Sequence, residues 1–579
     1  MKRMIPKTPK FDNALGVILE ELRPHARICK TCGSEFQIFK EDTEFYAMFR
    51  VPPPTLCPLC RKQRRFAHLL RLPKFFKRRC AAPGHTEEVI SVYPPGTPHA
   101  LYDFSYYHSD AWEAAEYGRQ YNPSRSFFTR FKELFFATPH VSIDRDPQGV
   151  NSDYSVGGLA VKDVYYSAIV YHVENVFYSH TALYSRDIGD CSIVNRSELC
   201  YNTVTSTHCH RCVFCVESTL CTDSFFLYEC TNCTSCFLSS NLRNKSYVFR
   251  NEQLTKEDYE KRIQKINLGD REVFTQYTQE FLALMQKSIH RATANINAVD
   301  SLGSRMINCR NVYFGFTLLE SENVRYMDNG DYMKDSMDVA NSVHSEKLYE
   351  SVVASGSDIL FSMYVRNSLS VEYSSECANC KYCFGCVGLK NKEYHIFNTP
   401  YREAEYWKTF DAIKTKMLTD GEYGEFFPMN LGLVPYQTSI AQKYFPLERE
   451  EAERRGIPWY DEPVSLLQEG IRIRRAEEVP RNIRDADDSI LNNAILCEKT
   501  GRPFRMIPKE LQFYRQLNVP LPTLHPWERM RARDRLEQGV RLYPFLCPQC
   551  GKEKHTVYPP AEQKRLTILC EACYLQSVL

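Results

Sequence analysis

The chain has 579 residues, a mass of 67.5 kDa and a formal net charge of +2, so composition alone indicates no strongly acidic or basic partner. Hydrophobic residues make up 43% of it, which excludes a disordered chain, and no run approaches the roughly 20 apolar residues of a membrane span. This length predicts roughly two to four structural units. The 24 cysteines and the absence of an export signal predict a cytoplasmic protein whose thiols bind metal or lie buried rather than form disulfides.

Residues 1–28 are predicted to form a helical arm that leads into a four-cysteine set. Cys29 and Cys32 form one CxxC pair, and Cys57 and Cys60 form a second pair 24 residues further on. Each pair supplies two thiolates from one tight turn, and two such turns close a tetrahedron around zinc. We predict a zinc site here rather than four unrelated cysteines.

A basic segment with interleaved aromatic residues, "RKQRRFAHLLRLPKFFKRR" (61–79), follows the second pair. Guanidinium groups contact phosphates and aromatic rings stack on unpaired bases, so the segment predicts RNA or a ribonucleoprotein as partner. An equally weighted alternative is a charged helix or linker whose apolar side chains dock on the zinc module. The predicted nucleic-acid-binding residues are Arg61, Lys62, Arg64, Arg65, Arg71, Lys74, Lys77, Arg78 and Arg79.

A second, degenerate module is predicted after this segment. Cys80 and His85 could hold a metal with Asp103 or His108, but the last CxxC pair of a complete set is missing, so a decayed site is the favoured interpretation. The two modules fill residues 29–112, and a connector is predicted over residues 113–160.

The middle of the chain is predicted to be a duplicated β-solenoid, which makes the protein mainly β. From residue 161 a pattern recurs about every twelve residues. The two copies are assigned to residues 161–251 and 301–398, and their matching stretches lie at an offset of 148, then 147 after one residue is lost. Stacked coils with a short period are typical of a solenoid, but the pattern leaves open a coil of about 12 or about 24 residues. Helical segments are predicted over 252–300 and, with a linker, over 399–490, where Tyr259 and Tyr406 begin apolar stripes of helical spacing.

The duplication separates structural cysteines from candidate ligands. A free cysteine packs like a small apolar residue, whereas leucine cannot replace a ligand, so cysteines that align with apolar residues are expected in the core. These are Cys191, Cys200, Cys212, Cys215, Cys221 and Cys309. The triplet Cys230, Cys233 and Cys236 recurs as Cys377, Cys380 and Cys383, so a metal role stays open there as the lesser interpretation.

Residues 491–579 are predicted to hold two further modules, the first of them degenerate. Cys497 matches Cys29 at an offset of 468, but the positions of the other three cysteines hold a threonine, His525 and Glu528, so Cys497 and His525 are weak metal candidates. A complete set follows at Cys547, Cys550, Cys570 and Cys573. The two complete sets predict about two zinc ions per chain.

The pattern CxxCGxxF, a Phe–Tyr pair, a proline-containing turn and CPxCRxxRR, over residues 29–65, resembles the zinc-ribbon or treble-clef domain of bacterial proteins. The whole arrangement, with such modules at both ends of a repetitive middle, is similar to cysteine-rich repeat proteins of candidate-phyla bacteria. The resemblance implies zinc and this order of modules, and it implies no reaction.

No nucleotide-binding, zinc-protease or hydrolase motif occurs in a suitable setting, so we expect a non-enzymatic binding protein. A protein–protein scaffold with zinc modules as structural caps is the second hypothesis. The third is a carbohydrate-active β-helix enzyme, in which acidic side chains pair in space. The acids considered are Asp144, Asp146, Asp328 and Asp331, for which turn formation is the more ordinary role.

Overall fold

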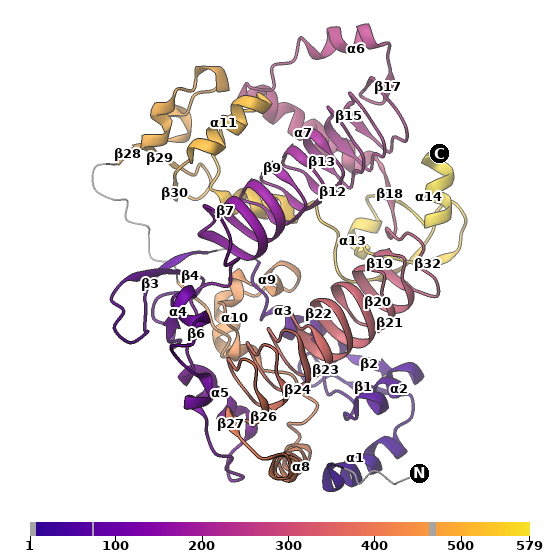
Figure 1. The fold of residues 1–579 in the computed structure, drawn as a ribbon. Coiled ribbons are helices and arrows are strands. Elements are labelled where there is room, and N and C mark those ends of the chain that lie inside the picture. The colour runs from indigo at the N-terminus through magenta and orange to yellow at the C-terminus, as the bar shows by residue number, and fades with distance from the viewer. Residues whose placement is uncertain (1–6, 72–73, 462–470, 579) are drawn as a thin grey trace. The chain divides into compact units, whose positions relative to one another are not determined.

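The computed structural model describes residues 7–71, 74–461 and 471–578, so residues 1–6 of the predicted arm, residues 72–73, residues 462–470 of the predicted linker and residue 579 lie outside it. The chain is mainly β, with helices beside the strands (Figure 1). It divides into two compact units: unit 1 is Met1–Leu70, Phe75–Ile143 and Ala294–Tyr460, and unit 2 is Arg71–Lys74, Asp144–Thr293 and Asp461–Leu579. In the described ranges no helix is both long and apolar enough to cross a membrane.

Unit 2 is built on coils of short parallel strands. The strands are β7 (Tyr154–Phe177), β8 (His180–Leu183), β9 (Arg186–Gly189), β10 (Ser192–Asn195), β11 (Glu198–Tyr201), β12 (Val204–Thr207), β13 (His210–Val216), β14 (Phe225–Tyr228), β15 (Phe237–Ser240), β16 (Val248–Phe249) and the antiparallel β17 (Glu252–Gln253). Ala168 pairs with His180 and Glu174 pairs with Arg186, so each coil advances twelve residues. The sheet closes on itself because β11 pairs with both β9 and β13.

These coils turn in steps of three residues. From Ala160 to Arg250 every third residue has a positive φ, and the residue that follows it faces the interior, as Val161 and Val164 do. Asn and Asp enter this left-handed region more readily than other side chains, and they also link coils: Asn232 Nδ2 donates to Asn244 Oδ1, 2.7 Å away and twelve residues on. Four three-residue steps make one coil, which favours the twelve-residue period over the period of 24.

Small side chains fill the coil interior. Val170 and Cys200 are fully buried, and serines alternate with them at the inward positions. Ser167 Oγ donates to the carbonyl of Tyr165 at 3.0 Å and accepts the amide of Ser179 at 3.1 Å, twelve residues on. Each such serine satisfies its own hydroxyl and one backbone amide, so it can be buried at little cost.

Unit 1 contains a second set of coils. Its strands are β19 (Leu302–Ile307), β20 (Arg310–Leu319), β21 (Glu322–Arg325), β22 (Asp328–Val352), β23 (Gly356–Leu360), β24 (Ser368–Glu372), β25 (Lys381–Phe384), β26 (Glu393–Ile396) and the antiparallel β27 (Thr399–Pro400). Glu346 pairs with Ser357, eleven residues on, whereas in the next register Gly356 pairs with Ser368, twelve residues on. The coil that reaches Gly356 is therefore one residue shorter than the next, and the φ of 134° at Gly356 suits glycine alone.

Helices cover one face of each set of coils. Unit 2 has α6 (Lys256–Ile263) and α7 (Arg271–Lys287), and unit 1 has α5 (Phe127–Ala137) and α8 (Glu403–Thr419). Thr255 Oγ1 caps α6, and Tyr406 in α8 is buried, as the apolar stripes predict. Phe281 of α7 packs on Phe226 with ring centroids 5.9 Å apart, and Phe127 of α5 packs in the same way on Tyr373 at 5.1 Å.

The helices α5 and α7 are counterparts at an offset of 150 residues. His140 Nε2 contacts the carbonyl of Phe135 at 2.8 Å, and His290 Nε2 contacts that of Met285 at 2.9 Å. Each helix leads into a short parallel strand, β6 (His140–Val141) or β18 (Ile289–Arg291). Yet α7 follows the coils that it covers, whereas α5 comes before β7 in the chain and covers the coils of unit 1. The two units therefore join similar parts in different chain order.

Four small modules complete the units. The first has β1 (His25–Ile28), β2 (Glu35–Ile38), α2 (Lys40–Phe49) and α3 (Pro58–Phe66); the second has β3 (Phe76–Arg79), β4 (Glu88–Ser91), β5 (Leu101–Tyr102) and α4 (Phe104–His108). The third has β29 (Asn493–Leu496), β30 (Pro503–Phe504), α11 (Pro508–Leu517) and α12 (Pro526–Asp534); the fourth has β31 (Tyr543–Leu546), β32 (Glu553–Thr556), β33 (Thr567–Leu569) and α14 (Glu571–Val578). The first two belong to unit 1 and the last two to unit 2.

The remaining elements connect these parts. The helices are α1 (Pro9–Glu21), which lies in the predicted arm, α9 (Ile440–Tyr444), α10 (Arg449–Arg454) and α13 (Pro560–Gln563), and the strand β28 (Arg472–Arg474) pairs with β29. The 3₁₀ helices are Ala114–Tyr117, Met429–Leu431, Tyr436–Thr438, Ala476–Glu478, Ile483–Asp485 and Asp488–Asn492.

Candidate metal centres

The first module brings all four predicted cysteines together. The sulfur atoms of Cys29, Cys32, Cys57 and Cys60 lie within 4.8 Å of one another. Cys29 follows the strand β1 and accepts the amide of Cys57 at 3.3 Å, and Cys57 caps α3 by accepting the amide of Cys60 at 3.5 Å. The hydrogen bond with Cys60 lowers the pKa of Cys57 to about 5, so a thiolate forms readily at this position.

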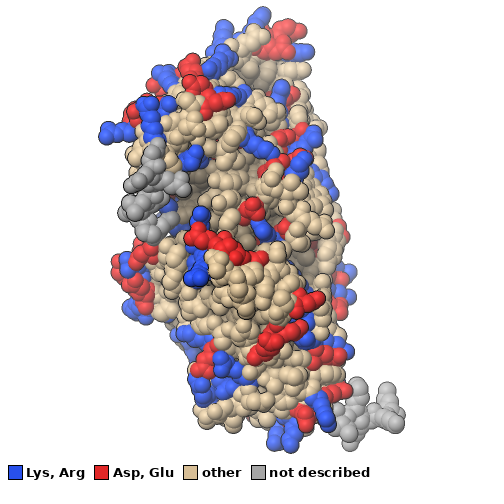
Figure 2. All heavy atoms as spheres, turned by 60° about the vertical axis from the view of Figure 1, so that its left-hand side comes forward, with Lys and Arg blue, Asp and Glu red and all other residues tan. Residues whose placement is uncertain are grey.

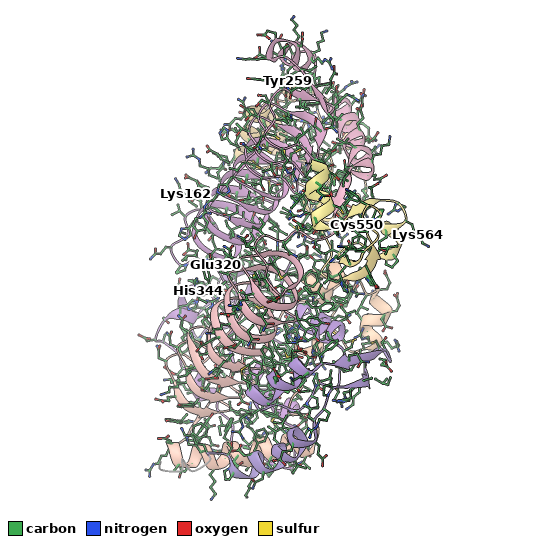
Figure 3. All side chains as sticks on the ribbon, turned by 90° about the vertical axis from the view of Figure 1, so that its right-hand side faces the viewer. Lys162, Tyr259, Glu320, His344, Cys550 and Lys564 are labelled. Atoms are coloured by element: carbon green, nitrogen blue, oxygen red, sulfur yellow. The ribbon has the colours of Figure 1, made fainter. Side chains whose placement is uncertain are left out.

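The fourth module repeats this arrangement. The sulfur atoms of Cys547, Cys550, Cys570 and Cys573 lie within 4.8 Å of one another, and the amide of Cys570 donates to Cys547 Sγ at 3.5 Å. Burial raises the pKa of Cys547, but the backbone amides of Cys570, Cys550 and Gln549 lower it to about 6. Cys550, labelled in Figure 3, is exposed on its loop, so this set can be reached from solvent.

Both sets have the geometry and chemistry of a closed metal site. Four thiolates from two turns match the tetrahedral preference of Zn²⁺ and leave no position for a substrate. In each set the first and third sulfurs are buried, while an amide already orients the first. The two complete sets are thus compatible with metal binding of a structural kind.

The second module gathers more ligands than the sequence predicted. Cys80 and His85 meet Asp103, and Glu87 joins them, with ligand atoms within 4.8 Å of one another. The other predicted candidate, His108, does not belong to this group. Glu87 was missed because its only signal is a position two residues after His85.

The third module does not assemble a metal set. Among the described residues, no third ligand atom converges with Cys497 and His525. Glu528 pairs instead with Lys499 at 2.6 Å and with Arg531 at 2.9 Å. Burial lowers the pKa of His525 to about 3, and its Nδ1 accepts the amide of Trp527. The weak metal role predicted for Cys497 and His525 is therefore not supported.

The CxxCxxC triplets are interior residues of the coils. A step of three residues takes successive cysteines to successive sides of one coil, so Cys377, Cys380 and Cys383 approach from different walls. Their sulfur atoms contact backbone carbonyls, Cys377 that of Ser375 at 3.4 Å, and they do not form one of the convergent groups of the described chain. Cys230, Cys233 and Cys236 lie in the same way in unit 2. The minority prediction of a metal at the triplets is not supported.

The six cysteines that the sequence predicts in the core also lie inside the coils. Each of them is at most 1% exposed and belongs to the core of one of the two sets of coils. Because the register is one residue shorter just before Gly356, an offset of 147 rather than 148 applies to three of these cysteines. The counterparts of Cys212, Cys215 and Cys221 are Ile359, Ser362 and Ser368, all of which are also buried.

The first part of the basic segment, Arg61 to Arg65, is buried in unit 1, which does not support its predicted role in phosphate binding. Arg61 and Arg65 on α3 are 1% and 0% exposed, and both pair with Asp338, Arg61 Nη2 at 2.8 Å and Arg65 Nη1 at 3.0 Å. Lys62 pairs with Asp328 at 2.9 Å, and Arg64 is held by Glu350 and Glu425. The carboxylates neutralise these cations, so an RNA cannot reach them. The alternative of a charged helix docked within the protein is the better interpretation.

The rest of the segment offers few free cations. Arg71 pairs with Asp534 and with Glu537, and Lys74 lies 4.0 Å above the ring of Trp527. Arg78 donates to the carbonyl of Pro94 at 2.5 Å and to Thr97 Oγ1 at 2.9 Å, and Lys77, which is exposed, lies 3.5 Å from Glu88. Arg79 is exposed on β3. Lys77 and Arg79 alone keep the accessibility that phosphate contacts require.

The ion pairs of α3 recur in unit 2. Arg529 and Arg533 on α12 are the counterparts of Arg61 and Arg65 at the offset of 468, and both contact Asp190, Arg533 Nη1 at 2.6 Å. Asp190 is the counterpart of Asp338 at the offset of 148. The offsets of 468 and 148, taken together, relate all three charges of unit 1 to those of unit 2 and are the sequence signal for this contact.

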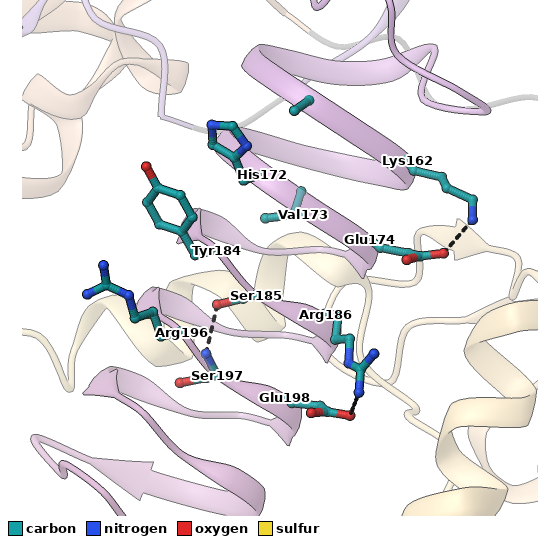
Figure 4. Close-up of a pocket in the computed structure, with 11 residues that line it drawn as sticks. Lys162, His172, Val173, Glu174, Tyr184, Ser185, Arg186, Arg196, Ser197 and Glu198 are labelled. Carbon is teal, nitrogen blue, oxygen red and sulfur yellow. Dashed lines mark hydrogen bonds and ion pairs between the residues drawn. The ribbon is translucent and has the colours of Figure 1, made fainter.

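The outer surface shows charges of both signs. On the face in Figure 2, Lys and Arg alternate with Asp and Glu, and no broad patch of one sign appears among the residues described there. A shallow hollow on the unit 2 coils has stacked rings on one edge, His172 and Tyr184 with centroids 4.9 Å apart, and Arg196 lies 5.5 Å from the same tyrosine ring (Figure 4). The charges on its other edge pair as Lys162 with Glu174 and Arg186 with Glu198.

The acids considered for glycoside hydrolysis have structural contacts. Asp328 is the buried partner of Lys62, and Asp146 accepts the amides of Gln148 at 3.0 Å and Val161 at 3.1 Å. Asp144 and Asp146 belong to unit 2, whereas Asp328 and Asp331 belong to unit 1. The contacts of Asp146 and Asp328 are therefore structural.

The comparisons with known proteins add no relative: no family model, no curated protein and no solved structure matches this chain. The resemblance to zinc-ribbon repeat proteins stays a prediction that rests on the motifs over residues 29–65.

Proposed function

We propose that this chain is a non-enzymatic, zinc-dependent scaffold in which two copies of a β-solenoid are each anchored by a zinc-ribbon-type module and the copy in unit 2 binds a protein partner through its outer face. The observation that carries the proposal is the burial of α3. Its N-terminus is the Cys57 turn, and its arginines enter the carboxylates of the coil. An ion bound by the cysteines would fix the end of the helix that holds the coil.

The repetition of this contact supports duplication of the whole assembly. Arg61, Arg65 and Asp338 in unit 1 correspond to Arg529, Arg533 and Asp190 in unit 2. A shared ancestor of module and coil accounts for the same three charges in the same buried contact. In unit 2 the helix that makes the contact belongs to the third module, which has lost its ligands, while the fourth module keeps a complete set. The scaffold thus retains one four-cysteine set in each unit.

A protein is the favoured partner because most of the cations predicted for RNA are buried among carboxylates and aromatic rings of the fold. Ladders of paired charges and the stacked rings of His172 and Tyr184 give the hollow a mixed polar and aromatic character, which is typical of protein-recognition surfaces. RNA binding would instead need a positive surface, and its affinity would fall steeply with salt.

Capture of partners from the native host tests the proposal. The full chain is crosslinked with and without ribonuclease, and a Tyr184→Ala variant is compared with Tyr332→Ala, the matched change on unit 1 at the offset of 148. We expect the same protein to be recovered after ribonuclease treatment and to be lost with the first variant. Recovery that depends on RNA, or cleavage of an oligosaccharide by the purified chain, would contradict the scaffold function.

A further inference from the structure

The second module contains a convergent ligand set whose geometry suits a metal ion. Cys80 Sγ lies 3.6 Å from His85 Nδ1 and 3.9 Å from Asp103 Oδ2, and the two latter atoms are 3.4 Å apart. Zinc–ligand bonds of about 2.0–2.3 Å in a tetrahedron separate neighbouring ligand atoms by roughly 3.3–3.8 Å. All three separations are therefore close to the edges of a metal-centred tetrahedron.

The set occupies the place of the four cysteines in the fourth module. Cys80 follows β3 as Cys547 follows β31, and Asp103 lies between β5 and α4 as Cys570 lies between β33 and α14. His85 lies in the hairpin loop where Cys550 lies in the other module. Each hairpin is followed by the same VYPP run, at residues 92–95 and 557–560. The second and fourth modules thus place their candidate ligands at equivalent positions, where histidine and aspartate in the second module replace two of the cysteines.

A backbone hydrogen bond shows that the first ligand is still oriented for an ion. The amide of Asp103 donates to Cys80 Sγ at 3.3 Å, as the amide of Cys57 does to Cys29 at 3.3 Å. The ring of Tyr106 packs against that of His85 with centroids 4.9 Å apart and fixes its plane. Asp103 uses Oδ1 to cap α4, which leaves Oδ2 directed toward Cys80 and His85.

We propose that Cys80, His85, Glu87 and Asp103 bind a third divalent transition-metal ion, of which Zn²⁺ is the best match. Thiolate, imidazole and carboxylate are all zinc ligands, and the mixed set is softer than an all-oxygen site for Mg²⁺ or Ca²⁺. Glu87 Oε1 lies 2.6 Å from His85 Nδ1, which is a hydrogen-bond distance, so an ion bound by both displaces the proton between them and moves the half-exposed Glu87 carboxylate away from the ring nitrogen.

This third site is weaker and more exchangeable than the two four-cysteine sets. The Glu87 side chain is 52% exposed and that of His85 is 28% exposed, so water competes for their positions. Only one of its ligands is a thiolate. The site therefore releases its ion first when a chelator is added or the pH falls.

Metal analysis of the full chain at saturating, buffered Zn²⁺ tests the site. We expect three ions per chain in the unmodified protein and two in either His85→Ala or Asp103→Asn, because both residues belong to the third site. The Asn side chain keeps the oxygen that caps α4. His108→Ala, a matched change in the same module, should keep all three. Co²⁺ substitution gives a second readout, because the spectrum lost in His85→Ala should be that of a mixed S/N/O site rather than of four thiolates.

Two ions in the unmodified chain, or an unchanged ion count in both His85→Ala and Asp103→Asn, would overturn the third site. Either result leaves the two four-cysteine sets and the scaffold function untouched. The four-cysteine sets have a separate test. If Cys29→Ser or Cys547→Ser left the ion count unchanged, the set that contains that cysteine would not bind an ion.

Discussion

Arg65 Nη1 and Asp338 Oδ1 lie 3.0 Å apart, and neither side chain is exposed to solvent. A buried ion pair compensates for the desolvation of its charges only while both partners are present. The pair therefore makes the position of α3 depend on the register of the coil strand β22. Arg533 and Asp190 make the equivalent pair in unit 2 at 2.6 Å.

Removal of the carboxylate is expected to destabilise unit 1 strongly. Asp338→Asn leaves the buried charges of Arg61 and Arg65 only partly neutralised, because Glu350 is then the carboxylate that still pairs with both of them. The expected loss is about 3–5 kcal/mol in the free energy of unfolding, measured by urea denaturation. Glu174→Gln is the control, because its exposed pair with Lys162 contributes about 0–1 kcal/mol. Equal effects of the two changes would show that burial of the first pair has no energetic consequence.

The ligand cysteines and the interior cysteines are expected to respond differently to substitution. Cys57→Ser removes one ligand of a convergent set, so we expect the chain to lose one metal equivalent and unit 1 to unfold at lower temperature. Elemental analysis and calorimetry measure the two effects. A Cys57→Ser chain that keeps its full metal content would exclude the first module as a site.

An interior cysteine should tolerate an apolar replacement. Cys191 is fully buried, and its counterpart at the offset of 148 is Val339, so Cys191→Val preserves the chemistry of the position. The expected cost is below about 1.5 kcal/mol, with no change in metal content. Cys191→Asp is the contrasting variant, since it places a charge among the valines and cysteines of the core, and it should prevent folding of unit 2.

The sequence predicted both complete cysteine sets and the twelve-residue recurrence because each is a local pattern of a few residue types. It did not predict the burial of Arg61 and Arg65, since the partner Asp338 is some 270 residues away and only the fold brings the charges together. A basic segment interleaved with aromatic residues is expected both of a phosphate-binding surface and of a helix that packs on buried acidic residues, so the pattern does not distinguish them. The relation of α5 to α7 was missed because helical packing preserves apolar spacing rather than sequence identity.

The pH dependence of stability should be opposite at two equivalent histidines. Burial lowers the pKa of His290 to about 4, and its two ring nitrogens contact the Met285 carbonyl and the Tyr228 hydroxyl. The unfolded chain, with a histidine pKa of about 6.5, binds the proton more tightly. The stabilising effect is therefore complete above about pH 6.5 and is lost as the pH falls toward 4, by at most about 3 kcal/mol.

His140, at the matching position in unit 1, provides the internal control. Burial lowers its pKa, but the Glu376 carboxylate that contacts Nδ1 raises it above the ordinary value overall. Its contribution to stability is present below about pH 6.5 and is lost as the pH rises through the folded-state pKa. Denaturation of His290→Gln and His140→Gln at pH 5 and pH 8 measures both effects against the unmodified chain. We expect the first variant to gain relative stability at pH 5 and the second to lose it there, and a change of the same sign in both would contradict the opposite protonation of the two sites.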